Sequence, residues 1–358
     1  FNTRYSTNNV KKWTPGAVPT ATYADRWVTV SGNKPDGSPY MGHWAQRSVV
    51  VAALKAALAA SQDARAEQTY FNLMATPGYT EALSDMVSLN ADKKEMAFII
   101  GDTPARLDPS GTSVSNWASN AAGATEDGPN GLITHSEFAG LYYPWALATN
   151  LDGSSVFVPP SVMALRTYAY NDQVAYPWFA PAGFNRGLVT GVNSVGYLTS
   201  TNSFQFVQLS QGQRDVMYNN EINPVAYIPN RGLVIYGQKT LAPVSSAMDR
   251  VNVARLITYF NYQLDLLAKP FLFEPNDVQT QRAVVTTFTG FIGNLVGLRA
   301  IYDFAVVCDE TNNTAERIDR NELWIDIAIK PEKAIEFIYI PIRLLNTGEP
   351  LPGANRGA

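Results

Sequence analysis

The sequence predicts a mixed fold of the α/β and α+β kinds: a layered α/β N-terminal domain, followed by a two-layer C-terminal unit of two helices on a mainly antiparallel sheet. Strand and helix patterns alternate up to about residue 236, which is typical of layered α/β domains. Beyond that point, two long helical stripes precede three strand patterns. With 358 residues, the chain has room for about two domains that each bury a core.

Residues 1–40 are rich in Thr, Asn, Gly and Pro and show little periodicity, so we predict a loop or an arm around the folded body. Because the chain begins with Phe1 rather than Met, we expect a processed or excised piece. The α/β domain is predicted to cover residues 41–236. It opens with an Ala-rich helix over 44–65, in which apolar residues recur at every fourth position: Val50, Leu54 and Leu58.

Helix and strand patterns then alternate along the rest of this domain. In chain order they predict a helix over 81–89, a strand over 96–100, an aromatic strand over 142–147, a helix over 162–170, a strand over 188–191, a helix near 204–219, and strands over 224–228 and 233–236. Pro159-Pro160-Ser161 is expected to open the helix at 162, because the first helical turn tolerates proline. Residues 105–135 are polar and rich in Gly and Ser, which indicates an exposed connection with at most one short helix.

The C-terminal unit, predicted over residues 237–346 with a tail over 347–358, begins with two amphipathic helices. Their apolar stripes are Val253, Leu256, Ile257, Phe260, Leu264 and Leu267, and then Val284, Phe288, Phe291, Ile292 and Leu295. Gly290, Gly293 and Gly297 lie within the second helix, at a cost of roughly 1 kcal/mol each relative to alanine. These glycines suggest that another backbone approaches this helix closely.

Three strand patterns complete the unit, over 301–307, 323–329 and 335–342. In the second pattern, apolar and other residues alternate with the period of a strand that has one buried face. The polar loop CDETNNT, residues 308–314, has the alternating oxygens of a calcium loop, but Arg320 stands where a bidentate glutamate is needed. A tight turn built on Asx and Thr side chains is therefore favoured over a metal site.

Composition limits the possible partners. The net charge of −4 offers no basic surface for nucleic acid or anionic lipid, and no apolar run approaches the roughly 20 residues that cross a bilayer. We therefore predict no nucleic-acid partner and no membrane insertion. Charged residues make up only 16% of the chain, which suits a protein that hides much of its surface in an assembly. The single cysteine, Cys308, is expected to be a small buried apolar residue.

No group of residues stands out as catalytic, and no cofactor is predicted. The segment GLVIYGQKT, residues 232–240, lacks the spacing of a phosphate-binding loop, because Gln238 separates the second glycine from the lysine. Asp102 and Asp108 are one of many chance carboxylate pairs. The aromatic segments 141–145 and 175–183 are expected to be buried packing rather than a ligand cage.

Two histidines, His43 and His135, are present, and neither has a recognisable catalytic motif around it. An α/β enzyme with an unrecognised active site remains an alternative, and it would need a deep pocket that holds a histidine with a shifted pKa. A carbohydrate- or receptor-binding module is another alternative, and it would need Trp145 or Trp178 to face the solvent.

Several segments resemble the sheath proteins of contractile phage tails, in the order in which that family has them. In the C-terminal block these are the CDETNNT loop with Ile318-Asp319, IDIAIKP at 325–331 and EFI at 336–338. The upstream blocks are Phe98–Pro104, SEFAGLYYPW at 136–145, VPPS at 158–161, YNDQVAYPWFAPAG at 170–183, YGQKTL at 236–241, DRVNVARL at 249–256 and FEPND at 273–277. Lys239 stands where the family more often has arginine, which puts a bidentate contact there in doubt.

The resemblance implies a structural subunit that polymerises helically around a tail tube and contracts to drive the tube through the host envelope, without enzymatic activity. It implies other sheath subunits, the tube protein, and baseplate and tail terminator proteins as partners. It also implies a location in the virion tail, and in the host cytoplasm during assembly. A sheath from a bacterial contractile injection system or a bacteriocin remains an alternative.

A tube-facing surface is predicted in the C-terminal unit. Four cations lie in or beside the loops of its otherwise apolar sheet: Arg317, Arg320, Lys330 and Lys333. We expect them to meet acidic groups on the tube, and solvated surface charges are the alternative explanation.

Overall fold

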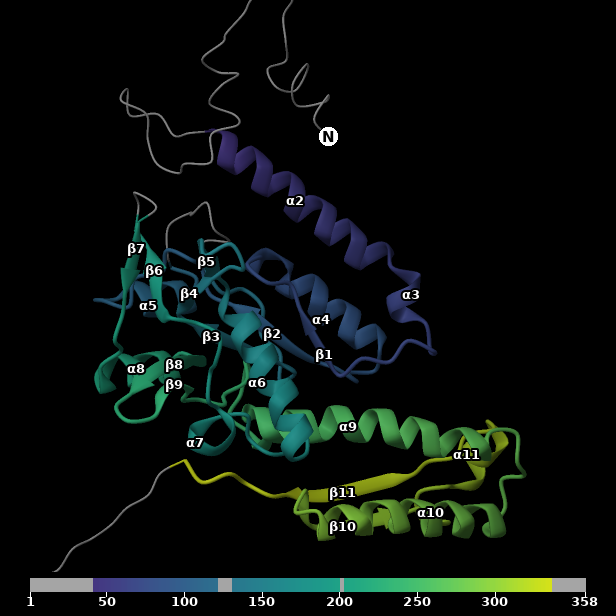
Figure 1. The fold of residues 1–358 in the computed structure, drawn as a ribbon. Coiled ribbons are helices and arrows are strands. Elements are labelled where there is room, and N and C mark those ends of the chain that lie inside the picture. Colours follow the sequence, from purple (N-terminus) through teal and green to yellow (C-terminus); the bar gives the residue numbers. More distant parts are fainter. Residues whose placement is uncertain (1–40, 122–130, 200–202, 337–358) are drawn as a thin grey trace, which may run out of the picture.

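The computed structural model describes residues 41–121, 131–199 and 203–336 (Figure 1). Over residues 41–49 it describes the helical backbone and, among the side chains, only that of Arg47. Its centre is a five-stranded sheet in the order β1-β2-β3-β8-β9. The strands are β1 (Leu73–Ala75), β2 (Phe98–Asp102), β3 (Ala139–Tyr143), β8 (Ile222–Ile228) and β9 (Gly232–Ile235). The first four are parallel, and β9 runs antiparallel to β8.

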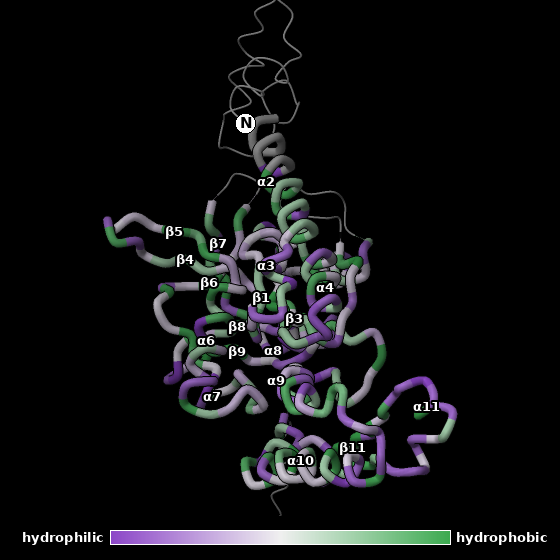
Figure 2. Tube along the Cα trace, turned by 90° about the vertical axis from the view of Figure 1, so that its right-hand side faces the viewer, coloured by the Kyte–Doolittle hydropathy of each residue, from purple (hydrophilic) through white to green (hydrophobic). Residues whose placement is uncertain are grey.

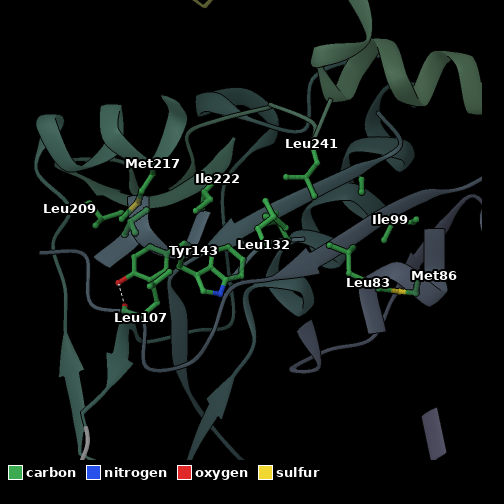
Figure 3. Packing of buried hydrophobic residues seen from close by; sticks show 14 of the residues in the cluster. Leu83, Met86, Ile99, Leu107, Leu132, Tyr143, Leu209, Met217, Ile222 and Leu241 are labelled. Atoms are coloured by element: carbon green, nitrogen blue, oxygen red, sulfur yellow. Dashed lines mark hydrogen bonds between the residues drawn. The ribbon is translucent and has the colours of Figure 1, made fainter. Parts of the chain in front are cut away.

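Helices cover both faces of this sheet, so β2 and β3 are buried along their whole length. One face carries α4 (Leu83–Asp92), α5 (Ser113–Ala118) and α8 (Gln211–Asn219), and the other carries α6 (Pro160–Val174) and the start of α9 (Val251–Ala268). Successive residues of β2 point to opposite faces: Ile99 joins the first cluster, while Phe98 and Ile100 join the second. Figure 3 shows part of the first cluster, where the Tyr143 hydroxyl donates to the Leu107 carbonyl at 2.8 Å.

A long helix and a second sheet flank this core. α2 (Met41–Ala60) lies outside α4, joined to it by the Lys55–Asp85 ion pair at 3.3 Å, and leads into α3 (Gln62–Arg65). The second sheet is antiparallel, in the order β5-β4-β6-β7. Its strands are β4 (Trp145–Thr149), β5 (Ser155–Val158), β6 (Ser194–Leu198) and β7 (Phe204–Phe206), and α7 (Gly183–Arg186) lies between β5 and β6 in the chain.

The C-terminal unit consists of α9, α10 (Val278–Gly297), an antiparallel hairpin of β10 (Ile301–Val307) and β11 (Asp326–Pro331), and the short α11 (Ala315–Asp319). Figures 1 and 2 show this unit at the opposite end of the molecule from the start of α2, with α9 between the hairpin and the central sheet. The predicted two-layer arrangement, two helices on an antiparallel sheet, is confirmed. The predicted third strand, 335–342, lies almost wholly outside the described residues, so the described sheet has two strands.

The aromatic strand predicted over 142–147 is wrong, because that segment divides between two sheets. β3 ends at Tyr143 in the parallel sheet, and β4 begins at Trp145 in the antiparallel one. The Tyr143–Pro144 peptide bond between them is cis. A run of apolar residues reads as one strand in the sequence, but the chain changes direction at this proline.

Two further predictions for this part of the chain need correction. Leu188 forms only an isolated bridge with Val234, and the strand lies instead at Ser194–Leu198. The helix predicted near 204–219 is a strand at its start, Phe204–Phe206, and the helix α8 begins only at Gln211. The Ser210 side chain caps α8 by accepting from the Gln213 backbone N–H, and the Gln213 side chain accepts from the Ser210 backbone N–H.

The connection predicted as exposed over 105–135 is only partly so: residues 110–113 and 119–121 are exposed, other residues are buried, and residues 122–130 lie outside the described structure. It contains the expected short helix, α5, but Val114, Trp117 and Leu132 are buried in the core on one face of the central sheet. Val114 and Trp117 have the three-residue spacing of one helix face, but two apolar residues in a polar segment are too few to predict burial from sequence.

The glycines of α10 do not serve a close backbone contact within the described residues. A Cβ added at Gly290 or Gly297 would meet nothing within 4 Å, and one at Gly293 would meet only the Phe304 ring at 3.9 Å. The close approach suggested by the sequence is therefore not found among the described residues.

Candidate functional site

The hairpin β10–β11 is the surface that the sequence singled out. Alternate residues of β11 are half-buried against α9 and α10, including Ile327 and Ile329, as the period of the sequence predicted. The opposite face is exposed and carries Tyr302, Ala305 and Ala328. Within the described part of the chain β10 and β11 pair only with each other, so both edges present unpaired backbone groups.

The loop after β10 is a turn held by its own side chains. The Asp309 carboxylate accepts from the backbone N–H of Thr311 at 2.9 Å, which confirms the Asx turn. Asn313 is buried, accepting from the Trp324 N–H at 2.7 Å and donating to the Trp324 carbonyl at 3.0 Å. Cys308 is buried, as expected. Among the described residues, no group of His, Cys, Asp and Glu could hold a metal ion.

The four predicted tube-facing cations do not gather at one place. Arg317 lies over the Trp324 ring at 3.9 Å, at the α11 end of the hairpin, and Arg320 pairs there with Glu316 and Glu322, each at 3.0 Å. Lys330 lies at the far end of β11, where it pairs with Asp303 at 3.2 Å.

Exposure to solvent limits what these cations contribute to the stability of the fold. Lys333, beyond β11, is exposed. The Arg320 and Lys330 pairs are also largely exposed, so solvent screens them and they contribute little to folding. Three of the four side chains therefore have an internal partner that a tube contact would have to share or replace.

A cavity of about 190 Å³ lies between α2, α4 and the carboxyl end of β2. Asp102 lines it, but its carboxylate is committed to structure: it accepts from the Gly78 and Ser161 N–H groups at 2.7 and 2.6 Å and from the Ser161 hydroxyl at 2.8 Å. Since Ser161 is in the first turn of α6, Asp102 caps that helix from the neighbouring strand. Burial raises the pKa of Asp102 to about 6.

The other described candidates from the sequence do not line this cavity. The His135 side chain is exposed, lies 4.0 Å from Glu221, and does not line this cavity; the His43 side chain lies outside the described residues. Trp178 is buried and Trp145 half-buried, stacked on Phe157. The segment at 232–240 begins with strand β9 instead of a phosphate cradle.

The contacts by which α9 joins the two parts of the chain were not predicted from the sequence. Arg255 is 1% exposed and makes a bidentate pair with Asp172 at the end of α6, at 2.9 and 2.6 Å. Tyr262 stacks on Tyr70, with ring centroids 3.7 Å apart. Asn261 donates to the carbonyl of Lys94 at 3.1 Å. The two residues of each contact lie far apart in the sequence, so no spacing in the sequence indicates that they meet. Among helices in the described ranges, none combines the length and apolarity of a membrane span.

A hairpin that packs on α9 and α10, and whose two edges are unpaired in the described structure, is typical of surfaces through which protein subunits associate. Residues 244–344 match the sequence profile of the family described as phage tail sheath C-terminal domain. The chain is 43% identical over 172 residues to the tail sheath protein of Vibrio phage KVP40, covering 48% of this chain and 24% of that protein. It is 31% identical over 234 residues to the tail sheath protein of Enterobacteria phage T4, covering 65% and 34%. The similarity to tail sheath proteins expected from the sequence is confirmed.

The chain spans about a quarter to a third of the length of these curated relatives. Its fold is similar to a chain in the contracted-state baseplate of the anti-feeding prophage, with a TM-score of 0.62 at 21% identity over 80% of this chain and 76% of that one. It is also similar to a chain of the contracted PVC sheath complex of an extracellular contractile injection system, with a TM-score of 0.60 at 19% identity over 77% and 72%. At these identities the likeness establishes the shared fold.

Proposed function

We propose that this chain is part of a structural subunit of a contractile phage tail sheath, which polymerises helically around a tail tube and contracts to drive the tube through the host envelope. The observation that carries the proposal is the match of the C-terminal unit to the tail sheath domain, together with identities of up to 43% to phage tail sheath proteins. The hairpin supports it, because two strand edges that are unpaired in the described structure can accept strands from neighbouring subunits.

A sheath subunit needs no catalytic residues, since its work comes from a metastable lattice that rearranges. The commitment of the Asp102 carboxylate to the α6 cap supports a structural role for the cavity that it lines. We propose that the protein has no enzymatic activity, and that it resides in the virion tail after assembly in the host cytoplasm.

The proposed partners are further sheath subunits, the tail tube protein, and baseplate and tail terminator proteins. Arg317, Arg320, Lys330 and Lys333 are proposed to face the tube. Charge reversal at all four should abolish assembly templated by the tube, and unchanged assembly would discard the assignment. The four positions are also reversed one at a time, and reversal of the exposed Arg282 on α10 is the charge-matched control for each single reversal.

Electron microscopy of the full-length protein tests the proposed function. Hollow, striated cylinders are the expected result, either alone or with the tube protein present. A full-length protein that forms no helical polymer with its tube, or that turns over a small molecule catalytically, would contradict the proposal.

A second candidate is a sheath of a contractile injection system. The fold similarity to the anti-feeding prophage and PVC chains favours it. Genes for a capsid and DNA packaging beside the gene for this chain would favour the phage tail, and their absence would favour the injection system.

A further inference from the structure

The two ends of the C-terminal unit meet. Arg250 directly precedes α9, and Glu336 is the last described residue after β11. The Arg250 Nε lies 2.6 Å from Glu336 Oε1, and the Gln238 side chain donates to the same oxygen at 3.1 Å. Residues 250–336 therefore begin and end at one point, beside Gln238.

This point is built from partly or fully buried side chains. Gln238 is 4% exposed, and the side chains of Glu336 and Arg250 are 17% and 28% exposed. The backbone holds Gln238 and Arg250 in register, since the Val251 N–H donates to the Gln238 carbonyl at 2.8 Å and Lys239 bridges Arg250. Burial, and then the nearby Glu336 charge, raises the pKa of Tyr218, so the hydroxyl keeps its proton beside this carboxylate.

The contacts continue into the central sheet. Asn223 in β8 accepts from the Lys239 N–H at 2.6 Å and donates to the Lys239 carbonyl at 2.8 Å. Asn223 also donates to the Leu141 carbonyl of β3 at 3.1 Å. Hydrogen bonds, together with the chain from Gln238 to Lys239, thus connect Glu336 to the strands β8 and β3 of the central sheet.

Two further hydrogen bonds, both between residues of the 250–336 unit, hold the segment that follows β11. The Asn252 side chain donates to the Glu332 carbonyl at 3.2 Å, and the Glu332 N–H donates to the Ala300 carbonyl at 3.2 Å. Without the Glu336 contacts, tension on the chain at residue 336 would fall on these two bonds and then on the β10–β11 ladder, which has no neighbouring strand in the described structure.

We propose that Glu336 is a positioning residue, which with Arg250 and Gln238 forms a mechanical staple. The staple closes residues 250–336 into one unit and passes load on the chain beyond Glu336 directly into the central sheet. Its role in a sheath rests on the proposed function, in which subunits pull on one another. The staple keeps the hairpin folded while such a load is applied.

Single-molecule pulling on the isolated full chain tests the staple without any assembly. One handle is attached at the C-terminus and the other through Ser88→Cys, an exposed position on α4. Glu336→Gln should speed the first opening event about tenfold at a given force, because a charge-assisted contact is lost. Glu332→Gln is the matched control: it removes one charge from an exposed side chain of the same segment and should leave the rate unchanged.

Arg250→Lys keeps the charge but loses the fork geometry, so it should speed opening less than Arg250→Gln does. If Glu336→Gln fails to fold, Gln238→Met is pulled in its place and should also speed opening. Equal rates for wild type and the staple variants, or an equal effect of Glu332→Gln, would overturn the proposal. Absence of sheath-like cylinders in microscopy would instead overturn the proposed function and leave the pulling result standing.

Discussion

At the residue scale, the described structure depends on a few buried polar groups that each join two elements. Asp102 links β2 to the start of α6, and Arg255 links α9 to the end of α6. Each is nearly inaccessible to solvent and has its hydrogen bonds satisfied by its partners. Neither role was predictable from sequence, because Asp102 reads as the end of a strand and Arg255 interrupts an otherwise apolar stripe.

Asp102 should make stability depend on pH. Because burial raises its pKa to about 6, the folded chain holds a proton between about pH 4 and 6 that the unfolded chain releases. The Asp102 contribution to the free energy of unfolding should therefore fall by about 2–3 kcal/mol as pH rises through this window, and stay level above it. Urea unfolding of wild type and Asp102→Asn at pH 4 to 8 measures this.

Asp102→Asn also loses an acceptor for the Gly78 N–H and the Ser161 hydroxyl. Whatever its absolute stability, the difference between the two proteins should change over pH 4 to 6. A difference that stays constant across that range would contradict the assignment of this carboxyl.

Arg255→Lys should lower the free energy of unfolding by about 1–3 kcal/mol. Lysine keeps the charge but cannot bond both oxygens of Asp172, and it loses the guanidinium contact with the Tyr168 ring. Arg282→Lys, on the exposed face of α10, is the control and should lie within about 0.5 kcal/mol of wild type. Equal effects of both substitutions in denaturant unfolding would contradict this account.

At the element scale, strong periodicity was a reliable guide, and packing context decided the rest. The helices α9 and α10 and the strand β11 agree with the sequence prediction, because each carries apolar residues at the spacing of its element. The short strands β6 and β7 were missed, since three to five residues carry too little pattern. The division at Pro144 was missed because both sides of it are apolar.

The α10 glycines give a prediction for one element. Gly290 is exposed in the middle of the helix, with nothing near an added Cβ, so Gly290→Ala should stabilise the isolated chain by about 0.5–1 kcal/mol. Gly101→Ala is the contrast and should destabilise, because its Cβ would lie 2.7 Å from a Leu141 methyl. Thermal and urea unfolding measure both. A destabilising Gly290→Ala would mean that the helix has a neighbour at this position.

At the scale of the whole molecule, α9 belongs to two cores. Its first residues, Val251 and Ala254, pack against the central sheet, while Leu256 and Phe260 pack with α10 and the hairpin. The domain ranges 41–236 and 237–346 stay a prediction. Sequence patterns show which face of a helix is apolar, but they do not show that one helix serves two cores in succession.

The shared helix predicts that the two parts unfold together. Calorimetry of the isolated chain should show one transition whose calorimetric and van't Hoff enthalpies agree. Tyr262→Ala, which removes the stacking on Tyr70, should shift this transition to lower temperature without splitting it. Two separated transitions in wild type would show that the parts fold independently.

The burial of Cys308 has a practical consequence. The chain contains one cysteine, which is 4% exposed, and burial raises the pKa of its thiol. Thiolate is the reactive form, so maleimide and similar reagents will modify this native site slowly. Dyes or spin labels can therefore be directed to a cysteine added on the surface of the otherwise unaltered chain, and distances between labelled subunits become measurable in solution.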